Sequence, residues 1–298
     1  MRKFYLILIL SIPLIFLLHT KIFASSGYNS YLTITPPLKI INVNPKSSYK
    51  SFIEVLNRSQ ENKKVYLSVD SFREKGDTAS PLFSQKINDL SQAIHWIKIS
   101  KTQILNGGEK TKIYFTLNIP SLASPGSHYI AISVNTINKN LIESLRSLLI
   151  INVSGKIEAL GNIEKFSPTK YININPNINF QLFFQNRGNV YLAPSGFIII
   201  RNIFGQTVKI LPINKRESLT LTDATRLYQK NWQDNNFFNQ FGYFSSQLII
   251  SYRYGNKVYN LNNYANFFVI SPIYIIIILL LIIFAIIYII KVVWKRKK

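Results

Sequence analysis

The side chains that could bind a metal or catalyse a reaction are few in this sequence. The 298 residues include no cysteine, three histidines and 13 acidic residues. His95 and His128 each lie in or beside an alternating apolar segment, so they form a two-histidine metal site only if those segments face each other. The alternative is that both are partly buried or edge imidazoles. His19 lies in the N-terminal leader. The sequence therefore nominates no metal ligand.

The acidic residues do not form a recognisable active site. Asp70, Glu74 and Asp77 lie close together, but their spacing lacks the repeated oxygen ligands and the closing glutamate of a calcium loop. No phosphate-binding glycine loop and no Gly-x-Ser-x-Gly nucleophile turn occurs. A carboxylate pair for glycoside cleavage stays open, but the acids are too thinly spread to nominate two. We predict a protein that is not an enzyme, with no catalytic residue, no cofactor and no metal.

The elements that would position any site are predicted to be β-strands. Residues 51–55, 64–69, 112–117 and 129–134 alternate between apolar and polar side chains, and Pro, Gly and Asn separate such segments. This period of two is typical of half-buried antiparallel strands. The number of short strands predicts an all-β fold of immunoglobulin-like β-sandwiches.

The strands divide into two groups, so we predict two domains. The first sandwich is expected over residues 27–154 and the second over residues 155–271, with the boundary near Gly155. Because disulfides are impossible, each core must rest on packed aliphatic and aromatic side chains. Trp96 is the expected centre of the first core.

The two ends of the chain predict secretion and anchoring. Residues 1–26 have the basic start, short apolar core and small-residue exit of a cleavable signal peptide, although an uncleaved anchor is the alternative. Residues 272–293 are apolar for long enough to form one transmembrane helix. Residues 294–298 form a basic tail, which favours the cytoplasmic side. We therefore expect a single-pass protein of the cell membrane with an extracellular ectodomain.

The charge of the outer region is strongly positive. Of the 35 basic residues, three lie in the leader and five follow Ile290, and all 13 acidic residues lie between, which leaves the outer region at a net +14. Such a surface attracts polyanions. The predicted topology excludes nucleic acid and favours anionic wall polymers or lipid head groups. The alternative is that the lysines reflect genome composition and serve only solubility.

Two connections interrupt the strand pattern. Residues 73–93 are polar, with a short helix expected over 84–93, and residues 223–241 are rich in Asn, Gln and aromatic side chains, including Trp232. Long loops on a rigid sandwich often carry binding function. The alternative is that the aromatic segment only covers one end of the second sandwich.

One stretch of the sequence resembles a known family. It contains Trp-Ile at 96–97, Leu-Asn-Gly-Gly-Glu at 105–109, Ile-Pro at 119–120 and Ser-Pro-Gly-Ser-His-Tyr at 124–129. This pattern resembles bacterial WxL-interacting-type surface proteins, which share the plan of signal peptide, two sandwich domains, membrane span and basic tail. The turn at 186–190 is similar to one in related surface domains. The resemblance implies that the first domain binds peptidoglycan and the second a secreted WxL-bearing protein. The matched motifs are structural, so they identify no ligand-binding residue.

Three functions remain as hypotheses. The first is a membrane-anchored binding or scaffold protein that engages wall glycan or anionic wall polymer and a surface protein. The second is a chaperone-like assembly subunit that adds a β-strand at an open sheet edge. The third is a glycan-processing enzyme, which would need two carboxylates in one cleft.

Overall fold

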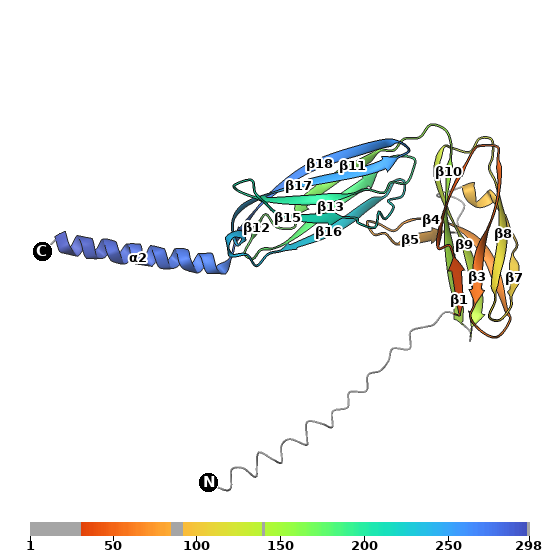
Figure 1. Cartoon of the computed structure of the whole chain (residues 1–298), viewed down its shortest axis with the longest axis horizontal. Coiled ribbons are helices and arrows are strands. Elements are labelled where there is room, and N and C mark those ends of the chain that lie inside the picture. Colours follow the sequence, from red (N-terminus) through yellow and green to blue (C-terminus); the bar gives the residue numbers. More distant parts are fainter. Residues whose placement is uncertain (1–30, 85–91, 139–140, 297–298) are drawn as a thin grey trace, which may run out of the picture.

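The computed structural model describes residues 31–84, 92–138 and 141–296, and most of these residues lie in β-strands (Figure 1). The strands form two β-sandwiches in succession along the chain, and one long helix follows them. The predicted all-β fold with two immunoglobulin-like sandwiches and a C-terminal apolar helix is confirmed. The predicted signal peptide lies outside the described residues.

The first sandwich is built from ten strands, which are β1 (Leu32–Thr35), β2 (Leu38–Val43), β3 (Ser48–Asn57), β4 (Lys63–Glu74), β5 (Pro81–Ser84), β6 (Ile97–Ile99), β7 (Thr102–Leu105), β8 (Lys110–Asn118), β9 (Gly126–Asn138) and β10 (Leu141–Val153). One sheet has the order β1-β3-β8-β6. The other has the order β2-β10-β9-β4-β5, and β7 also pairs with β4.

The second sandwich is built from eight strands, which are β11 (Gly161–Pro168), β12 (Ile172–Asn173), β13 (Asn177–Asn186), β14 (Ser195–Asn202), β15 (Thr207–Ile213), β16 (Thr225–Gln233), β17 (Phe241–Tyr254) and β18 (Lys257–Ile270). Its sheets have the orders β11-β13-β16 and β12-β18-β17-β14-β15.

The edge strand at the start of each sandwich is divided between the two sheets. In the first sandwich, β1 runs antiparallel to β3, and β2 then runs parallel to β10. In the second, β11 pairs with β13 and β12 pairs in parallel with β18. Pro36 and Pro37 lie at the first break, and Pro168 ends β11. Because proline has no N–H to donate to a ladder, it favours a change of partner at these points.

The two cores consist of side chains that point between the sheets, as the alternation of a strand requires. Trp96 is 5% exposed and belongs to the first core, as predicted. Trp232 is 1% exposed in the second core, where its ring packs edge-on against Phe244 at 5.3 Å and Phe267 at 5.8 Å. The location of Trp232 corrects the prediction that it lies in a loop over the end of the sandwich.

A buried asparagine forms the turn after β3 in the first sandwich and after β13 in the second. Asn57 ends β3 and donates from Nδ2 to the carbonyls of Glu61 (2.8 Å) and Leu105 (3.2 Å). Asn186 ends β13 and donates from Nδ2 to Val190 O (2.8 Å), among other carbonyls. Each asparagine satisfies carbonyls that the turn would otherwise bury without partners.

The two connections that we expected to be irregular are more regular than their composition predicts. The stretch after Arg73 is mainly the β4–β5 hairpin, and the described end of the expected helix is a single 3₁₀ turn, η2 (Gln92–His95). The stretch after Asp223 contains β16 and a second 3₁₀ turn, η3 (Phe237–Asn239). Polar side chains on the open side of β16 conceal its alternation in the sequence, which explains the error.

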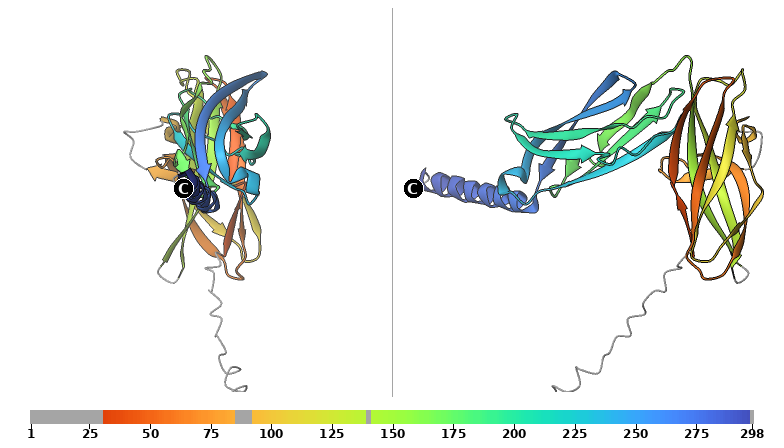
Figure 2. Two further views of the ribbon diagram at one scale, coloured as in Figure 1. Left: turned by 90° about the vertical axis from the view of Figure 1, so that its left-hand side faces the viewer. Right: turned by 45° about the vertical axis from the view of Figure 1, so that its right-hand side comes forward.

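The two sandwiches are in direct contact, and their long axes run in clearly different directions (Figures 1 and 2). A third apolar cluster fills the contact, with Phe72, Tyr129 and Ile150 from the first sandwich and Leu221 and Ala224 from the second. Hydrogen bonds cross the contact as well, including Ser127 N–H to Asn189 O (2.8 Å). The contact is therefore packed rather than a flexible linker.

The helix α2 (Pro272–Arg296) begins directly after the second sandwich. Only Ser271 separates it from β18, and the Ser271 N–H donates to Gln240 O at 2.8 Å. An 18-residue stretch within Pro272–Lys295 has a mean hydropathy of 3.5, and none of its residues is buried. By length and composition, this helix could cross a membrane.

Candidate binding groove at the open edge of the second sandwich

The strand β16 forms an edge of the second sandwich along its whole length. It pairs with β13 over nine residues without a register shift, and no strand of the described residues pairs with its other side. In the first sandwich, β8 occupies the corresponding position beside β3, but β6 covers its outer side. The second sandwich lacks that covering strand, so the backbone of β16 is left open.

β16 differs from the other edge strands in length and regularity. The strands β1, β2, β5, β6 and β7 have three to six residues each. In the second sandwich, β12 has two residues, β11 is bulged near Glu164, and β15 contains Pro212 and a register shift in its pairing with β14. Short, bulged or proline-containing edges resist pairing with another chain. β16 has none of these features.

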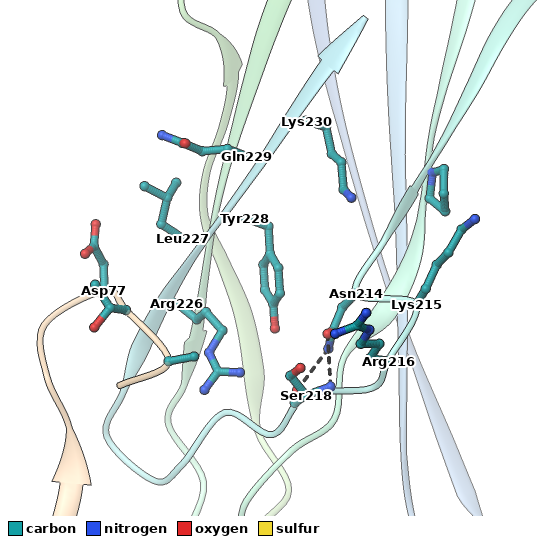
Figure 3. Close-up of a pocket in the computed structure, with 13 residues that line it drawn as sticks. Asp77, Asn214, Lys215, Arg216, Ser218, Arg226, Leu227, Tyr228, Gln229 and Lys230 are labelled. Carbon is teal, nitrogen blue, oxygen red and sulfur yellow. Dashed lines mark hydrogen bonds between the residues drawn. The ribbon is translucent and has the colours of Figure 1, made fainter. Parts of the chain in front are cut away.

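A groove of about 700 Å³ lies between β16 and the loop that follows β15 (Figure 3). Arg226, Tyr228 and Lys230 line the groove from one side of β16, and Leu227 and Gln229 project from the other side. This division follows from the alternation of side chains in a strand. The groove therefore combines an open backbone edge with a row of alternate side chains.

One asparagine shapes the loop on the far wall of the groove. Asn214 adopts a left-handed conformation with φ 46°, and its side chain bonds both backbone groups of Ser218, at 2.9 and 3.0 Å. Asn214 also donates to Pro194 O at 2.7 Å. Asparagine tolerates this conformation better than most residues. The fixed loop presents Lys215 and Arg216 to the solvent beside the groove.

The β4–β5 hairpin of the first sandwich closes one end of the groove. The Leu227 N–H donates to Asp77 O at 3.0 Å, so the N–H of residue 227 points away from β13. Because backbone directions alternate along an antiparallel strand, the N–H and C=O groups of Gln229 and Asn231 also point outward. Beyond Leu227, the described structure offers these outward groups no backbone partner.

A buried ion pair fixes the hairpin to β16. Arg226 Nη2 lies 2.7 Å from Glu74 Oε1, and the two side chains are 7% and 3% exposed. The same carboxylate accepts the Leu221 N–H at 2.7 Å. Burial raises the pKa of Glu74 above its ordinary value, and the hydrogen bond from Leu221 and the charge of Arg226 act in the opposite direction. The pair therefore joins the two sandwiches through charges removed from water.

The electrostatic character of the groove is basic. Four cationic residues, Lys215, Arg216, Arg226 and Lys230, line it together with one acid, Asp77. Arg226 Nη1 is buried and has no hydrogen-bond partner in the described structure. A buried guanidinium N–H without a partner is costly. The groove is thus suited to an extended segment that carries acidic groups.

The two candidate histidines differ in their surroundings. His128 packs against Trp96 at 4.6 Å between ring centroids and its Nε2 contacts Ser124 O, and burial lowers its pKa. His95 lies in η2 and is exposed. Among the described residues, no group of three His, Asp or Glu side chains could hold a metal ion.

The acidic cluster is likewise divided among different partners. Asp70 is buried and accepts a hydrogen bond from Ser133 at 2.6 Å, and Glu74 pairs with Arg226. Asp77 is exposed at the groove. These acids have separate structural environments and do not form a calcium loop. The functional residues that sequence reasoning missed are those of β16, and the alternation Arg-x-Tyr-x-Lys-x-Trp at 226–232 is the signal that could have found them.

Comparison with known proteins finds structural likeness only. No protein-family model matches the chain, and no curated protein matches it. Similar solved structures include a chaperone–tip adhesin complex of CFA/I fimbriae, with a TM-score of 0.44, 13% identity and coverage of 79% of this chain and 99% of that chain. The class 5 fimbriae chaperone CfaA has a TM-score of 0.42 at 13% identity, covering 78% and 98%. The chaperone–tip adhesion subunit complex CsuC–CsuE of Acinetobacter baumannii has a TM-score of 0.40 at 11% identity, covering 81% and 99%.

Proposed function

We propose that this chain is a membrane-tethered assembly subunit that binds an extended segment of a partner protein by β-strand addition along β16. The observation that carries this proposal is the open edge of β16, which is long, regular and bordered by a groove. An added strand forms hydrogen bonds with the outward backbone groups, and these provide affinity. Its alternate side chains enter the groove, and these provide specificity.

The charges at this edge support selection of an acidic partner segment. Lys230 points into the groove, where Lys215 and Arg216 also lie, and an inward charge on an edge strand discourages indiscriminate pairing. A partner segment with acidic side chains is not discouraged in this way, because its carboxylates pair with the cations of the groove. A basic segment would be repelled, so the same residues provide attraction and discrimination.

The tether sets where this binding takes place. The helix α2 spans the membrane in our proposal, and the basic residues that follow it stay on the cytoplasmic side. Both sandwiches then lie outside the cell, where the partner is a secreted or surface protein. The resemblance to WxL-interacting proteins makes a WxL-bearing protein the first partner class to test. We propose binding without catalysis.

A second candidate function is favoured by the exposed cations Lys215 and Arg216, which line the groove. Anionic wall polymer could enter the same groove and pair with these groups without using the backbone of β16. Polymer binding should weaken more than peptide binding as the salt concentration rises. It should not depend on the backbone groups of β16.

One experiment separates the two functions. The full chain in nanodiscs is tested against an array of 12-residue peptides that vary in acid content and in apolar alternation, and against polyglycerol phosphate. We expect acidic alternating peptides to bind the wild type and to lose binding at least tenfold in Gln229→Pro, which removes one outward N–H. The control variant Lys215→Ser/Arg216→Ser leaves the backbone of β16 unchanged. It should weaken the binding of polyglycerol phosphate more than the binding of the peptide. Equal peptide binding by wild type and Gln229→Pro would refute strand addition.

A further inference from the structure

The end of the second sandwich from which α2 emerges carries a concentration of exposed apolar side chains. Phe204 and Phe238 are 82% and 83% exposed. They belong to a group that we call the apolar collar, which consists of Ile172, Ile174, Ile203, Phe204, Phe237 and Phe238.

The collar comes from three separate segments that the fold brings to one level. Ile172 pairs with Phe268 of β18, and Phe268 lies opposite Tyr243 of β17. The β14–β15 turn, which carries Ile203 and Phe204, follows a residue paired with the neighbouring Phe244. The turn η3 directly precedes β17. Single exposed apolar residues are ordinary on a protein surface, but six at one end indicate a contact.

The collar continues directly onto the helix. The ring of Tyr274 packs against Phe237 at 4.9 Å and against Phe241 at 5.2 Å, and its hydroxyl donates to Phe237 O at 2.9 Å. The helix leaves the sandwich from this end and runs away from the first sandwich (Figures 1 and 2). The level of the collar relative to the helix is therefore fixed by contacts.

The length of the apolar helix places the collar at the bilayer surface. The uncharged run from Ile273 to Ile290 spans about 27 Å at about 1.5 Å per residue, against a hydrocarbon core of about 30 Å. Because the run is no longer than the hydrocarbon core is thick, its first residues must lie at the membrane–water interface. Tyr274 is one of them, and tyrosine is enriched at that interface. Phe237 of the collar contacts Tyr274, so the collar lies at a similar depth.

We propose that the apolar collar inserts into the head-group region of the bilayer that α2 spans, so that the second sandwich stands on the membrane in a fixed pose. This inference rests on the tether in the proposed function and is independent of strand addition. Lys170, which is exposed next to Tyr171 at this end, strengthens the contact when the lipids are anionic. A fixed pose holds the β16 groove at a constant height above the membrane.

Labelled single-cysteine variants test this proposal, because the chain has no cysteine of its own. The variants Phe204→Cys and Phe238→Cys place an environment-sensitive fluorophore in the collar. Asn256→Cys, in the exposed β17–β18 turn at the far end of the same sandwich, is the matched control, and Ile282→Cys marks the middle of the helix. Each full-length variant enters nanodiscs of phosphatidylcholine and phosphatidylglycerol that contain lipids spin-labelled near the head group or deep in the acyl chain.

We expect head-group spin labels to quench the probes at 204 and 238 at least threefold more than the probe at 256. The deep spin label should quench the probe at 282. Equal quenching at 204, 238 and 256 with deep quenching at 282 would overturn the collar while leaving the tether intact. Absence of deep quenching at 282 would overturn the tether, and the collar with it.

Discussion

The two sandwiches follow one plan and differ at the edge beside β8 and β16. Both divide their first edge strand between two sheets, and both form a turn around a buried asparagine, Asn57 or Asn186. In the first sandwich, β6 pairs with the outer side of β8, whereas no strand of the described chain pairs with the outer side of β16. In our proposal, the absence of a covering strand makes the edge of the second sandwich available for binding. The β4–β5 hairpin of the first sandwich contacts one end of β16, where the Leu227 N–H donates to Asp77 O.

The largest expected effect comes from breaking the tie between the sandwiches. Glu74→Ala leaves the Arg226 guanidinium buried without a counter-charge, and removing one partner of a buried pair costs about 3–5 kcal/mol. We expect the two sandwiches to unfold at separate temperatures in calorimetry of the full chain in micelles. Glu74→Leu with Arg226→Met removes both charges and should recover most of the loss. A single unchanged transition in Glu74→Ala would show that the pair does not couple the sandwiches.

Proline substitutions test the comparison between β8 and β16 directly. Thr116 of β8 lies between Lys50 of β3 and Lys98 of β6, so Thr116→Pro removes a ladder hydrogen bond and leaves its acceptor unpaired, which should cost about 1–3 kcal/mol. Gln229→Pro removes only an outward N–H and should change the free energy of unfolding by less than about 1 kcal/mol. Denaturant titration measures both. Similar losses at the two positions would mean that β16 is not an open edge.

Substitution of the buried asparagines tests the turn that the two sandwiches have in common. Asn57→Ala and Asn186→Ala each leave buried carbonyls without donors, which should cost roughly 2 kcal/mol in either sandwich. Limited proteolysis of the full chain locates the loss, and we expect cleavage to rise only in the sandwich that carries the change. Increased cleavage in both sandwiches after one substitution would contradict the view that each turn stabilises only its own sandwich.

The smallest expected effect concerns pH at the contact between the sandwiches. Burial raises the pKa of Tyr129 to about 12, and the hydrogen bond from the Thr222 N–H opposes this shift. Because the folded pKa lies above the unfolded value of about 10, the stabilisation is complete below pH 10 and is lost as the pH rises toward 12. Tyr129→Phe should remove a fall of roughly 1 kcal/mol between pH 9 and pH 11. Identical alkaline profiles for the two proteins would contradict the assignment.

The sequence predicts the strands, the two sandwiches and the apolar helix because these depend on local alternation and on length. Trp96 could be placed in the first core for the same reason. The groove could not be predicted, because Glu74 and Arg226 meet across 152 positions in the sequence and neither looks unusual locally. The same limit explains the error over residues 223–241, where Asn and Gln on the open face of β16 resemble a loop. The absence of a covering strand has no signal of its own in the sequence, so the open edge could not be predicted from it.

The central claim is that β16 offers an open backbone edge, and amide hydrogen exchange tests it most directly. In the free full-length chain in nanodiscs, we expect Gln229 and Asn231 to exchange at least a hundredfold faster than Tyr228 and Lys230, whose N–H groups face β13. An acidic alternating peptide from the array should then slow exchange at Gln229 and Asn231. Equal protection of all four amides in the free chain would contradict the account.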